Sequence, residues 1–290
     1  MKDVRKVPAS AGADWLLGGF RLLRQAPLGL AGLGLIYGLV ALLVPMSMQV
    51  NTTLFLVLEL LLVALGPVLT AGMVYAAQRV DRGERPLPVH LLQGLREGKA
   101  GRLLATLVPQ LAAVLLCALL LVAMVGGDAL GQMAQAFETM QKQAQPDASL
   151  LSGLPIGRLL LWMVLAVVIG VVTSFFTVLA VPEIMLTDSP AWDAMRRSFH
   201  ACMRNLLALI VFVVLAIIAV LAIYLAVVVV AAVLRLVAGE LVMQVVAQLL
   251  ATAILMPVLT GAMYTAWKQL FAGGASMGAS AITDRGGIEA

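Results

Sequence analysis

The sequence is poor in charged residues, aromatic residues and cysteine. Charged residues make up 12% of the chain, against about 25% in soluble domains, and aromatic residues make up 6%. A water-soluble fold of this composition would lack a polar surface. Hydrophobic residues instead reach 62%, so a protein with several membrane-spanning segments is the class that fits.

The residues that usually carry chemistry are also scarce. The chain has two cysteines, Cys117 and Cys202, and two histidines, His90 and His200. One cysteine lies in an apolar run and the other in a polar linker, so they form neither a disulfide framework nor a metal site. No metalloprotease, hydrolase or phosphate-loop motif is present. We therefore expect no enzymatic activity, no catalytic residue, no cofactor and no metal ion.

Six apolar runs are each long enough to cross a bilayer, which takes about 20 residues. They cover approximately 27–48, 54–78, 103–125, 156–185, 206–233 and 241–268. The polar first 26 residues and the long run that follows them do not fit a cleavable signal peptide. The sequence therefore predicts an all-α, polytopic membrane helix bundle. We expect a single integral membrane domain over 1–290, with flexible cytoplasmic tails at 1–14 and 269–290.

Basic residues fall mainly on one side of these spans. All but three of the 19 basic residues lie before the first span, in the linkers 79–102 and 196–204, or in the C-terminal tail. The other side carries only Lys142, Arg158 and Arg235. The positive-inside rule then predicts cytoplasmic termini in a bacterial inner membrane. Because this asymmetry accounts for the net charge of +4, we expect no nucleic-acid partner.

A twelve-residue stretch in the second span recurs in the sixth. LGPVLTAGMVYA at 65–76 and LMPVLTGAMYTA at 255–266 are identical at seven of twelve positions. Each copy holds a proline within an apolar run, where it removes a backbone donor and bends a helix. The fourth span holds a third such proline, so Pro67, Pro182 and Pro257 are predicted helix kinks.

Each pair of spans is preceded by a similar basic segment. These segments are 18–30, 93–107 and 197–210. The sequence thus predicts three helical-hairpin units, each with a cytoplasmic amphipathic segment in front. The units cover about 15–78, 91–186 and 192–268. Because all three enter from the same side, any symmetry axis would run along the membrane normal.

The apolar face of such a segment would meet acyl chains, and its basic side chains would meet anionic headgroups. The candidate headgroup contacts are Arg21, Arg24, Arg96, Lys99, Arg102, Arg197 and Arg204. An alternative that stays open is that basic residues simply flank any cytoplasmic helix end.

Four polar residues are candidates for an intramembrane polar site: Glu59, Thr70, Glu183 and Thr260. Glu59 lies inside the second span, about 7–8 Å from its outer end at 1.5 Å per residue. An intramembrane acid is by default a functional candidate, and Glu59 would be a proton or cation site. The alternative is that it meets water, Arg158 or Arg235.

The other three residues lie at or after the prolines. Glu183 follows Pro182 near the inner end of its span, and we expect it to pair with a neighbouring arginine. Thr70 and Thr260 come one turn after their prolines. We expect their hydroxyl groups to bond the carbonyls that the prolines leave free.

Three further patterns concern packing. Residues 126–155 form a long outer loop, and its periodicity predicts a short surface helix ended by Pro146 and Asp147.

The glycines at 29, 32, 34 and 38 permit close approach of another helix, within the bundle or between protomers. The tryptophans lie near span ends, as interfacial anchors do. They are Trp15, Trp162, Trp192 and Trp267.

The pattern V-P-A-x-x-G-x-x-W at 7–15, followed by GFRLL at 19–23, resembles an uncharacterised family of proteobacterial six-helix inner-membrane proteins. The repeated P-V-L-T segment before a basic linker fits the same family. The resemblance implies topology and compartment, without a mechanism. More remotely, the hairpin plan is similar to the membrane domain of some glycerophosphoryl diester phosphodiesterases. We expect none of their activity, since no phosphodiesterase domain accompanies the spans here.

Two functions stay open. The first is a non-enzymatic inner-membrane protein that organises or assists membrane lipids, through their anionic headgroups, or partner membrane proteins, including further copies of itself. The alternative is a small-molecule or lipid transporter with Glu59 as the proton or cation site, which needs polar residues to converge on one interior. An enzyme would need Glu183, Asp188, His90 and His200 to assemble, and their spacing gives no reason to expect this.

Overall fold

The computed structural model describes residues 4–142 and 155–272, in which the regular secondary structure is helical and no strand occurs. Six helices are long and apolar enough to span a membrane, judged by length and composition. They are Pro27–Met48, Thr52–Asp81, Ala100–Val125, Ile156–Leu186, Leu206–Val233 and Glu240–Phe271. The prediction of an all-α protein with six candidate spans is confirmed.

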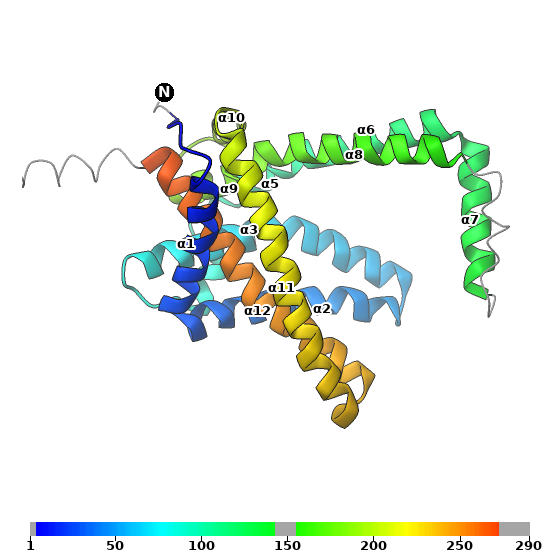
Figure 1. Cartoon of the computed structure of the whole chain (residues 1–290), viewed down its shortest axis with the longest axis horizontal. Coiled ribbons are helices and arrows are strands. Elements are labelled where there is room, and N and C mark those ends of the chain that lie inside the picture. Colours follow the sequence, from blue (N-terminus) through cyan, green and yellow to red (C-terminus); the bar gives the residue numbers. More distant parts are fainter. Residues whose placement is uncertain (1–3, 143–154, 273–290) are drawn as a thin grey trace, which may run out of the picture. The chain divides into compact units, whose positions relative to one another are not determined.

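The chain divides into two compact units, where the sequence predicts a single domain. The first unit combines Met1–Leu107 with Phe175–Ala290, and the second is Val108–Ser174. The helices of the first unit, in chain order, are α1 (Ala11–Gln25), α2 (Pro27–Met48), α3 (Thr52–Asp81), the 3-10 turn η1 (Pro88–Leu92), α4 (Gln93–Arg96), α5 (Ala100–Leu104), α9 (Ala180–Leu186), α10 (Ala191–Arg204), α11 (Leu206–Ala238), α12 (Glu240–Trp267) and η3 (Lys268–Ala272) (Figure 1).

Short turns close two hairpins in this unit (Figure 1). Between α2 and α3, the side chain of Asn51 accepts a hydrogen bond from the amide of Thr53 at 2.6 Å and caps α3. Between α11 and α12, Gly239 adopts φ +83°, a left-handed conformation that other residues rarely take. These turn residues explain why the long apolar runs stop and reverse where they do.

The two repeated prolines mark the start of a buried stretch of helix. Every buried residue of α3 follows Pro67. In α12 the buried residues begin at Pro257, apart from Ala253. Before the prolines, many apolar side chains of both helices are exposed or half-buried, as side chains that face lipid would be. Both helices continue through their prolines, so the repeat corresponds to the packed halves of α3 and α12.

At Pro182 the expected kink is a break between two helices. The second unit's α8 ends at Thr177 and α9 begins at Ala180, although the sequence predicts one span to residue 185. Proline cannot donate to the carbonyl four residues earlier. The carbonyl that Pro182 leaves without this donor is that of Val178, whereas Ser198 of α10 bridges the backbone groups of Phe175 and Leu179 at the break. Its hydroxyl donates to Phe175 O at 2.6 Å and accepts from the amide of Leu179 at 3.1 Å.

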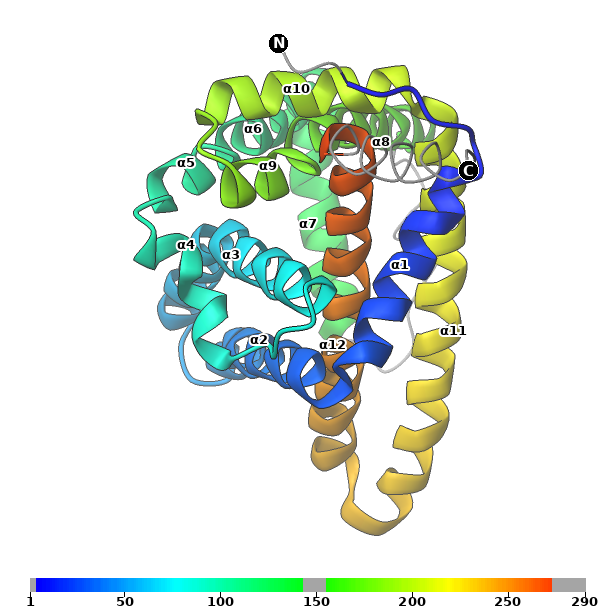
Figure 2. The ribbon, with the colours of Figure 1, turned by 90° about the vertical axis from the view of Figure 1, so that its left-hand side faces the viewer.

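Helices α3, α9 and α12, which hold Pro67, Pro182 and Pro257, contact one another. Each also packs against a segment that precedes a hairpin. Helix α12 contacts α1, α3 contacts η1, α4 and α5, and α9 contacts α10 (Figure 2). The basic segments of the chain therefore gather around the packed halves of these three helices. We call this part of the first unit the basic end; it consists of α1, η1, α4, α5 and α10 together with the packed halves of α3, α9 and α12.

The apolar face of α1 is covered by protein. It packs against α11 and α12 (Figure 2), and Trp15 and Leu22 on this face are buried. A Cβ atom at Gly12 would lie 2.1 Å from Ala208 O, and one at Gly19 would lie 2.1 Å from Val258 O. The face of α1 that carries Trp15 and Leu22 therefore packs against protein, where the sequence predicts contact with acyl chains.

The residues before α1 are also held, in contrast to the flexible tail expected for 1–14. The Asn205 side chain accepts from the amide of Val7 at 2.8 Å and donates to Arg5 O at 2.9 Å. The amide of Arg5 donates to Leu270 O at 3.2 Å. The described chain from Val4 onward thus forms part of the packed structure.

The glycines of α2 pack within the bundle. A Cβ atom at Gly34 would lie 2.6 Å from Thr252 O, and one at Gly38 would lie 2.2 Å from the Thr252 hydroxyl. Gly32 faces open space. The sequence leaves open whether these glycines pack within the bundle or between protomers. Gly34 and Gly38 pack within the bundle, because they bring α2 against α12.

The second unit is built by α6 (Leu107–Val125), α7 (Gly127–Lys142) and α8 (Ile156–Thr177). The indole nitrogen of Trp162 donates to Cys117 O at 2.8 Å and joins α8 to α6. Helix α7 is the short helix expected in the outer loop. Its predicted end at Pro146 and Asp147, and the tail from residue 273 on, lie outside the described residues.

Candidate functional site

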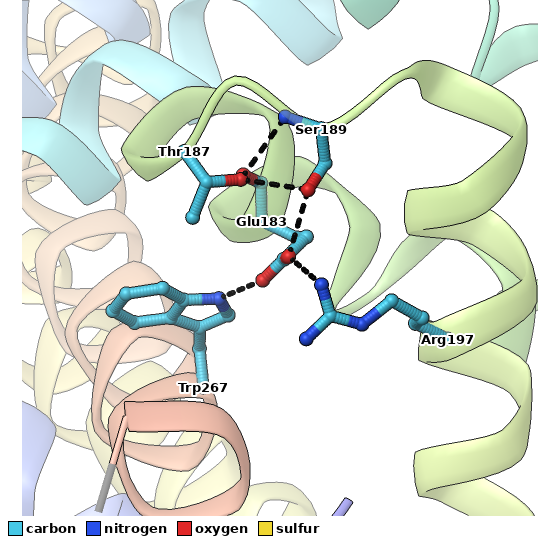
Figure 3. Close-up of polar contacts among 5 residues, drawn as sticks. All are labelled: Glu183, Thr187, Ser189, Arg197 and Trp267. Carbon is cyan, nitrogen blue, oxygen red and sulfur yellow. Dashed lines mark hydrogen bonds and ion pairs between the residues drawn. The ribbon is translucent and has the colours of Figure 1, made fainter. Parts of the chain in front are cut away.

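Glu183 is the centre of a buried polar cluster in the first unit (Figure 3). Only 2% of this residue is exposed. Its Oε1 pairs with the guanidinium of Arg197 from α10 and accepts from the Ser189 hydroxyl at 3.0 Å. Its Oε2 accepts from the indole nitrogen of Trp267 at 2.7 Å. The predicted pairing of Glu183 with a neighbouring arginine is confirmed.

This cluster joins three helices and has little capacity left for a ligand. Both carboxylate oxygens have donors, and the Thr187 hydroxyl donates to the backbone carbonyl of Glu183 at 2.6 Å. Among the described residues, no hydrogen bond or ion pair connects His90 or His200 to the cluster. A buried ion pair with these extra donors holds α9, α10 and α12 in one arrangement.

Two of the tryptophans expected at the membrane interface are instead buried. Trp15 is 2% exposed and Trp267 is 8% exposed, while Trp192 is 65% exposed. Each buried indole donates a hydrogen bond, to Gln269 from Trp15 and to Glu183 from Trp267. Only Trp192, of these three, has the exposure expected of an interfacial anchor.

His90 is buried in the 3-10 turn η1. Its Nδ1 accepts from the amide of Leu87 at 3.1 Å, and its ring lies edge-on to Tyr75 at 5.3 Å between centroids. Burial, and then the nearby Arg79 charge, lower the pKa of His90. A Cβ atom at Gly72 would lie 2.3 Å from Leu91 O, so the glycine in the first P-V-L-T copy allows η1 to pack on α3.

Glu59 lines a cavity of about 430 Å³ between α2, α3 and α12. Gln49, Gln244 and Gln248 line the same cavity. Among the described residues, no ion pair or hydrogen bond is made by the Glu59 side chain. Arg235, one of its expected partners, pairs with Glu240 at 2.8 Å. Glu59 therefore faces a cavity that carries other polar side chains.

The two threonines of the predicted polar site lie elsewhere. Neither Thr70 nor Thr260 lines this cavity. The Thr260 hydroxyl donates to Met256 O at 2.7 Å, whereas Pro257 frees the carbonyl of Ala253. The expected bond to a freed carbonyl is therefore wrong for Thr260, because its side chain reaches the ordinary carbonyl one turn back.

The glutamines of the cavity were not singled out by the sequence. Gln244 and Gln248 lie one helical turn apart within an apolar span, and this spacing is a signal that marks one polar face. Gln49 lies in the turn after α2, where a polar residue is ordinary. Only the packing of α12 against α2 and α3 shows that the three side chains and Glu59 share one cavity.

The basic candidates for headgroup contacts fall into two groups. Arg21, Arg24 and Arg96 are exposed and make no hydrogen bond or ion pair with another described residue. The other four are engaged within the protein. Lys99 donates to Met185 O at 2.8 Å, Arg102 to Asp188 O at 3.3 Å, Arg204 to Val4 O at 2.9 Å, and Arg197 pairs with Glu183.

Exposed arginines at the basic end stand beside exposed apolar side chains. We call these arrangements the three exposed stripes. They are Leu17, Arg21 and Arg24 on α1; Leu92, Leu95 and Arg96 on η1 and α4; and Trp192, Arg196 and Met203 on α10. On α1 and α10 the opposite faces are buried against protein. Each stripe thus offers apolar surface and positive charge together.

A comparison with known protein families, curated proteins and solved structures finds no match to this chain.

Proposed function

We propose that the protein is a non-enzymatic, multi-pass inner-membrane protein that binds anionic lipid headgroups at its basic end. Through this binding it would organise membrane lipids or partner membrane proteins. The three exposed stripes carry the proposal. Their leucine and tryptophan side chains would enter the acyl boundary, and their arginines would meet phosphate groups.

The arrangement of the basic end supports three hairpin units. Each unit would consist of a basic segment, an outgoing span and a returning, proline-bearing span. The contacts among α3, α9 and α12, and the packing of one basic segment on each, fit such units. In this arrangement each basic segment packs on the returning helix of the preceding unit, with α1 on α12 completing the cycle.

The basic end would face the cytoplasm. Because exposed arginines concentrate there, the positive-inside rule supports this orientation and cytoplasmic termini. Anionic lipids at the inner leaflet would then lie beside the stripes. The family resemblance of the N-terminal segment agrees with the same compartment.

A lipid-binding titration of the purified chain tests the proposal. Native mass spectrometry would measure the affinity for phosphatidylglycerol of the wild-type chain and of a triple variant with Arg21→Gln, Arg24→Gln and Arg96→Gln. Each basic residue near an anionic surface contributes about 1 kcal/mol. We therefore expect affinity to fall about a hundredfold.

A second triple variant is the matched control. Lys6→Gln, Arg82→Gln and Arg85→Gln remove the same charge from exposed residues outside the stripes. We expect a clearly smaller loss. Equal losses in both triple variants would mean that net charge alone attracts the lipid, and would contradict a role for the stripes.

Transport of a small molecule or lipid is the second candidate function. The cavity beside Glu59 favours it, because a cavity with several polar side chains is what a transport site requires. Flux into liposomes that contain the protein would test it. Flux that is absent, or unchanged by Glu59→Gln, would contradict a transport role for Glu59.

A further inference from the structure

The cavity beside Glu59 lies near the end of the first unit that is opposite the basic end. Glu59 comes seven residues after the start of α3, so it lies about 10 Å along the helix. The volume of about 430 Å³ lies within the usual range for small-molecule sites, about 300–1,000 Å³. It far exceeds the roughly 30 Å³ that one water molecule occupies. The cavity can therefore accept a ligand of several heavy atoms.

Hydrogen-bond acceptors converge on this cavity from three helices. Glu59 of α3 contributes a carboxylate, and Gln244 and Gln248 of α12 contribute amide oxygens. Pro45 and Ala41 of α2 also line it. Because proline has no N–H to donate, the carbonyl of Ala41, four residues before Pro45, has no partner in the helix. Because Ala41 lines the cavity, its carbonyl is a candidate for one further acceptor.

The charge of the cavity is unbalanced. No lysine, arginine or histidine lines it, and the carboxylate of Glu59 has no cationic partner among the described residues. A carboxylate within an apolar span is costly unless it is paired. A ligand with one positive charge and several N–H donors would complete the site.

The same acceptors do not suit a divalent metal ion. Calcium requires six to eight oxygen ligands and usually several carboxylates, whereas Glu59 is the one carboxylate here. Among the described residues, no group of three or more histidine, cysteine, aspartate or glutamate side chains could hold a metal ion. A primary ammonium group, with three N–H donors and a single charge, matches one carboxylate and neutral carbonyl oxygens.

The cavity is accessible from outside the protein. Met46 and Leu241 line it and are 52% and 65% exposed, so apolar chains could lie beside its rim. The amide nitrogens of the glutamines could donate to a phosphate next to the ammonium group. We propose that this cavity binds a primary ammonium group, with Glu59 as its counter-ion and the Gln244, Gln248 and Ala41 oxygens as further acceptors.

The ammonium group could come from an ethanolamine lipid headgroup or from a soluble amine. Native mass spectrometry on the delipidated full chain distinguishes them, with three separate probes. The first is phosphatidylethanolamine, the second is phosphatidylcholine with the same acyl chains, and the third is free ethanolamine. Phosphatidylcholine carries the same charge but no N–H donor.

Glu59→Gln is the decisive variant, because it keeps the shape and removes the charge. We expect phosphatidylethanolamine or ethanolamine affinity to fall about tenfold or more, the usual effect of losing a charge-assisted hydrogen bond. Asp128→Asn is the control, since Asp128 is an exposed carboxylate of α7 that does not line the cavity and makes no hydrogen bond or ion pair with another described residue. It should change affinity less than twofold. A melting curve of each variant shows whether folding is retained.

Gln248→Leu provides a second variant if Glu59→Gln fails to fold. It leaves the carboxylate in place and removes one acceptor, so a loss of a few fold is expected. Binding of both phosphatidylethanolamine and free ethanolamine shows that a soluble amine is enough for binding. Binding of phosphatidylethanolamine without ethanolamine identifies the lipid headgroup as the ligand. The proposal is overturned if phosphatidylcholine binds as tightly as phosphatidylethanolamine, if Asp128→Asn causes the same loss as Glu59→Gln, or if neither phosphatidylethanolamine nor ethanolamine binds.

Discussion

The indole nitrogen of Trp267 donates to Oε2 of Glu183 at 2.7 Å and thereby joins α12 to the short helix α9. Replacing Trp267 with Phe keeps an aromatic ring but leaves the buried carboxylate with one donor fewer. We expect the free energy of unfolding in detergent to fall by about 1–3 kcal/mol. Chemical denaturation followed by circular dichroism would measure it.

The exposed Trp192 is the control for this variant. Trp192→Phe changes a side chain that is 65% exposed and should alter stability by about 0.5 kcal/mol or less. If both substitutions have the same effect, the bond between Trp267 and Glu183 does not contribute in the way that its geometry indicates.

Ser198 should be important for the break between α8 and α9. Ser198→Ala removes the hydroxyl that bonds both Phe175 O and the amide of Leu179. Because two buried backbone groups lose their partner, we expect a loss of about 1–3 kcal/mol in the free energy of unfolding. Ser10→Ala, at an exposed serine that makes no capping bond, should change little. Equal stability of the two variants would contradict this role.

Two glycines of α2 give a matched test of helix packing. At Gly34 an added Cβ would lie 2.6 Å from Thr252 O and 2.8 Å from the Ala253 Cα, whereas at Gly32 it would meet nothing within 4 Å. Gly34→Ala should destabilise the protein by about 1–3 kcal/mol through overpacking. Gly32→Ala should be neutral or stabilising by up to about 1 kcal/mol, because alanine favours a helix. The opposite order of stabilities would contradict the packing of α2 on α12.

The lowered pKa of His90 predicts sensitivity to acid. Since the folded protein binds a proton at His90 less readily than the unfolded chain does, this histidine lowers stability as pH falls below its ordinary pKa of 6.5. The loss of stability levels off once the pH is below the lowered pKa of His90 in the folded protein. His90→Asn retains an acceptor for the amide of Leu87 and should flatten the fall in melting temperature between about pH 6.5 and pH 5.

His200, which is exposed on α10, is the control for the acid effect. His200→Asn touches no buried contact of η1, so the pH dependence of the melting temperature should keep its shape. If His90→Asn leaves that dependence as steep as in the wild type, burial of His90 is not its cause.

Asn205 should hold the residues before α1 in place. Asn205→Leu removes both bonds to the backbone of Val7 and Arg5. We expect the amide of Val7 to exchange with solvent deuterium at least tenfold faster, because its hydrogen bond is lost. Hydrogen-exchange mass spectrometry would show this in peptides that cover the N-terminal segment. Exchange that is already fast in the wild type would contradict the described contacts.

The spans were predictable because length and apolarity alone decide them. The first span, predicted at 27–48, coincides with Pro27–Met48. The break before Pro182 was not predictable to the residue, since it depends on Ser198, a partner that reaches the open backbone from α10. Proline indicates that a carbonyl is freed, but only tertiary structure shows whether the helix continues, as at Pro67, or divides.

The roles of single side chains at the basic end were less predictable. Arg197 and Arg21 follow the same sequence pattern, yet Arg197 pairs with Glu183 and Arg21 is exposed. Trp267 and Trp192 both lie near span ends, yet only Trp192 is exposed. Helical spacing shows that a residue lies at the end of a span. It does not show which face is covered, because this depends on helices that are distant in the sequence.

Photo-crosslinking in lipid bilayers tests the proposed headgroup contacts most directly. A photoreactive residue would replace Leu17, on the exposed stripe of α1, and in a second protein Leu22, which is buried on the opposite face. The account predicts crosslinks from position 17 to anionic phospholipid and crosslinks from position 22 only to the protein itself. Crosslinks from position 17 that reach only water or protein, or lipid crosslinks of equal yield from position 22, would contradict it.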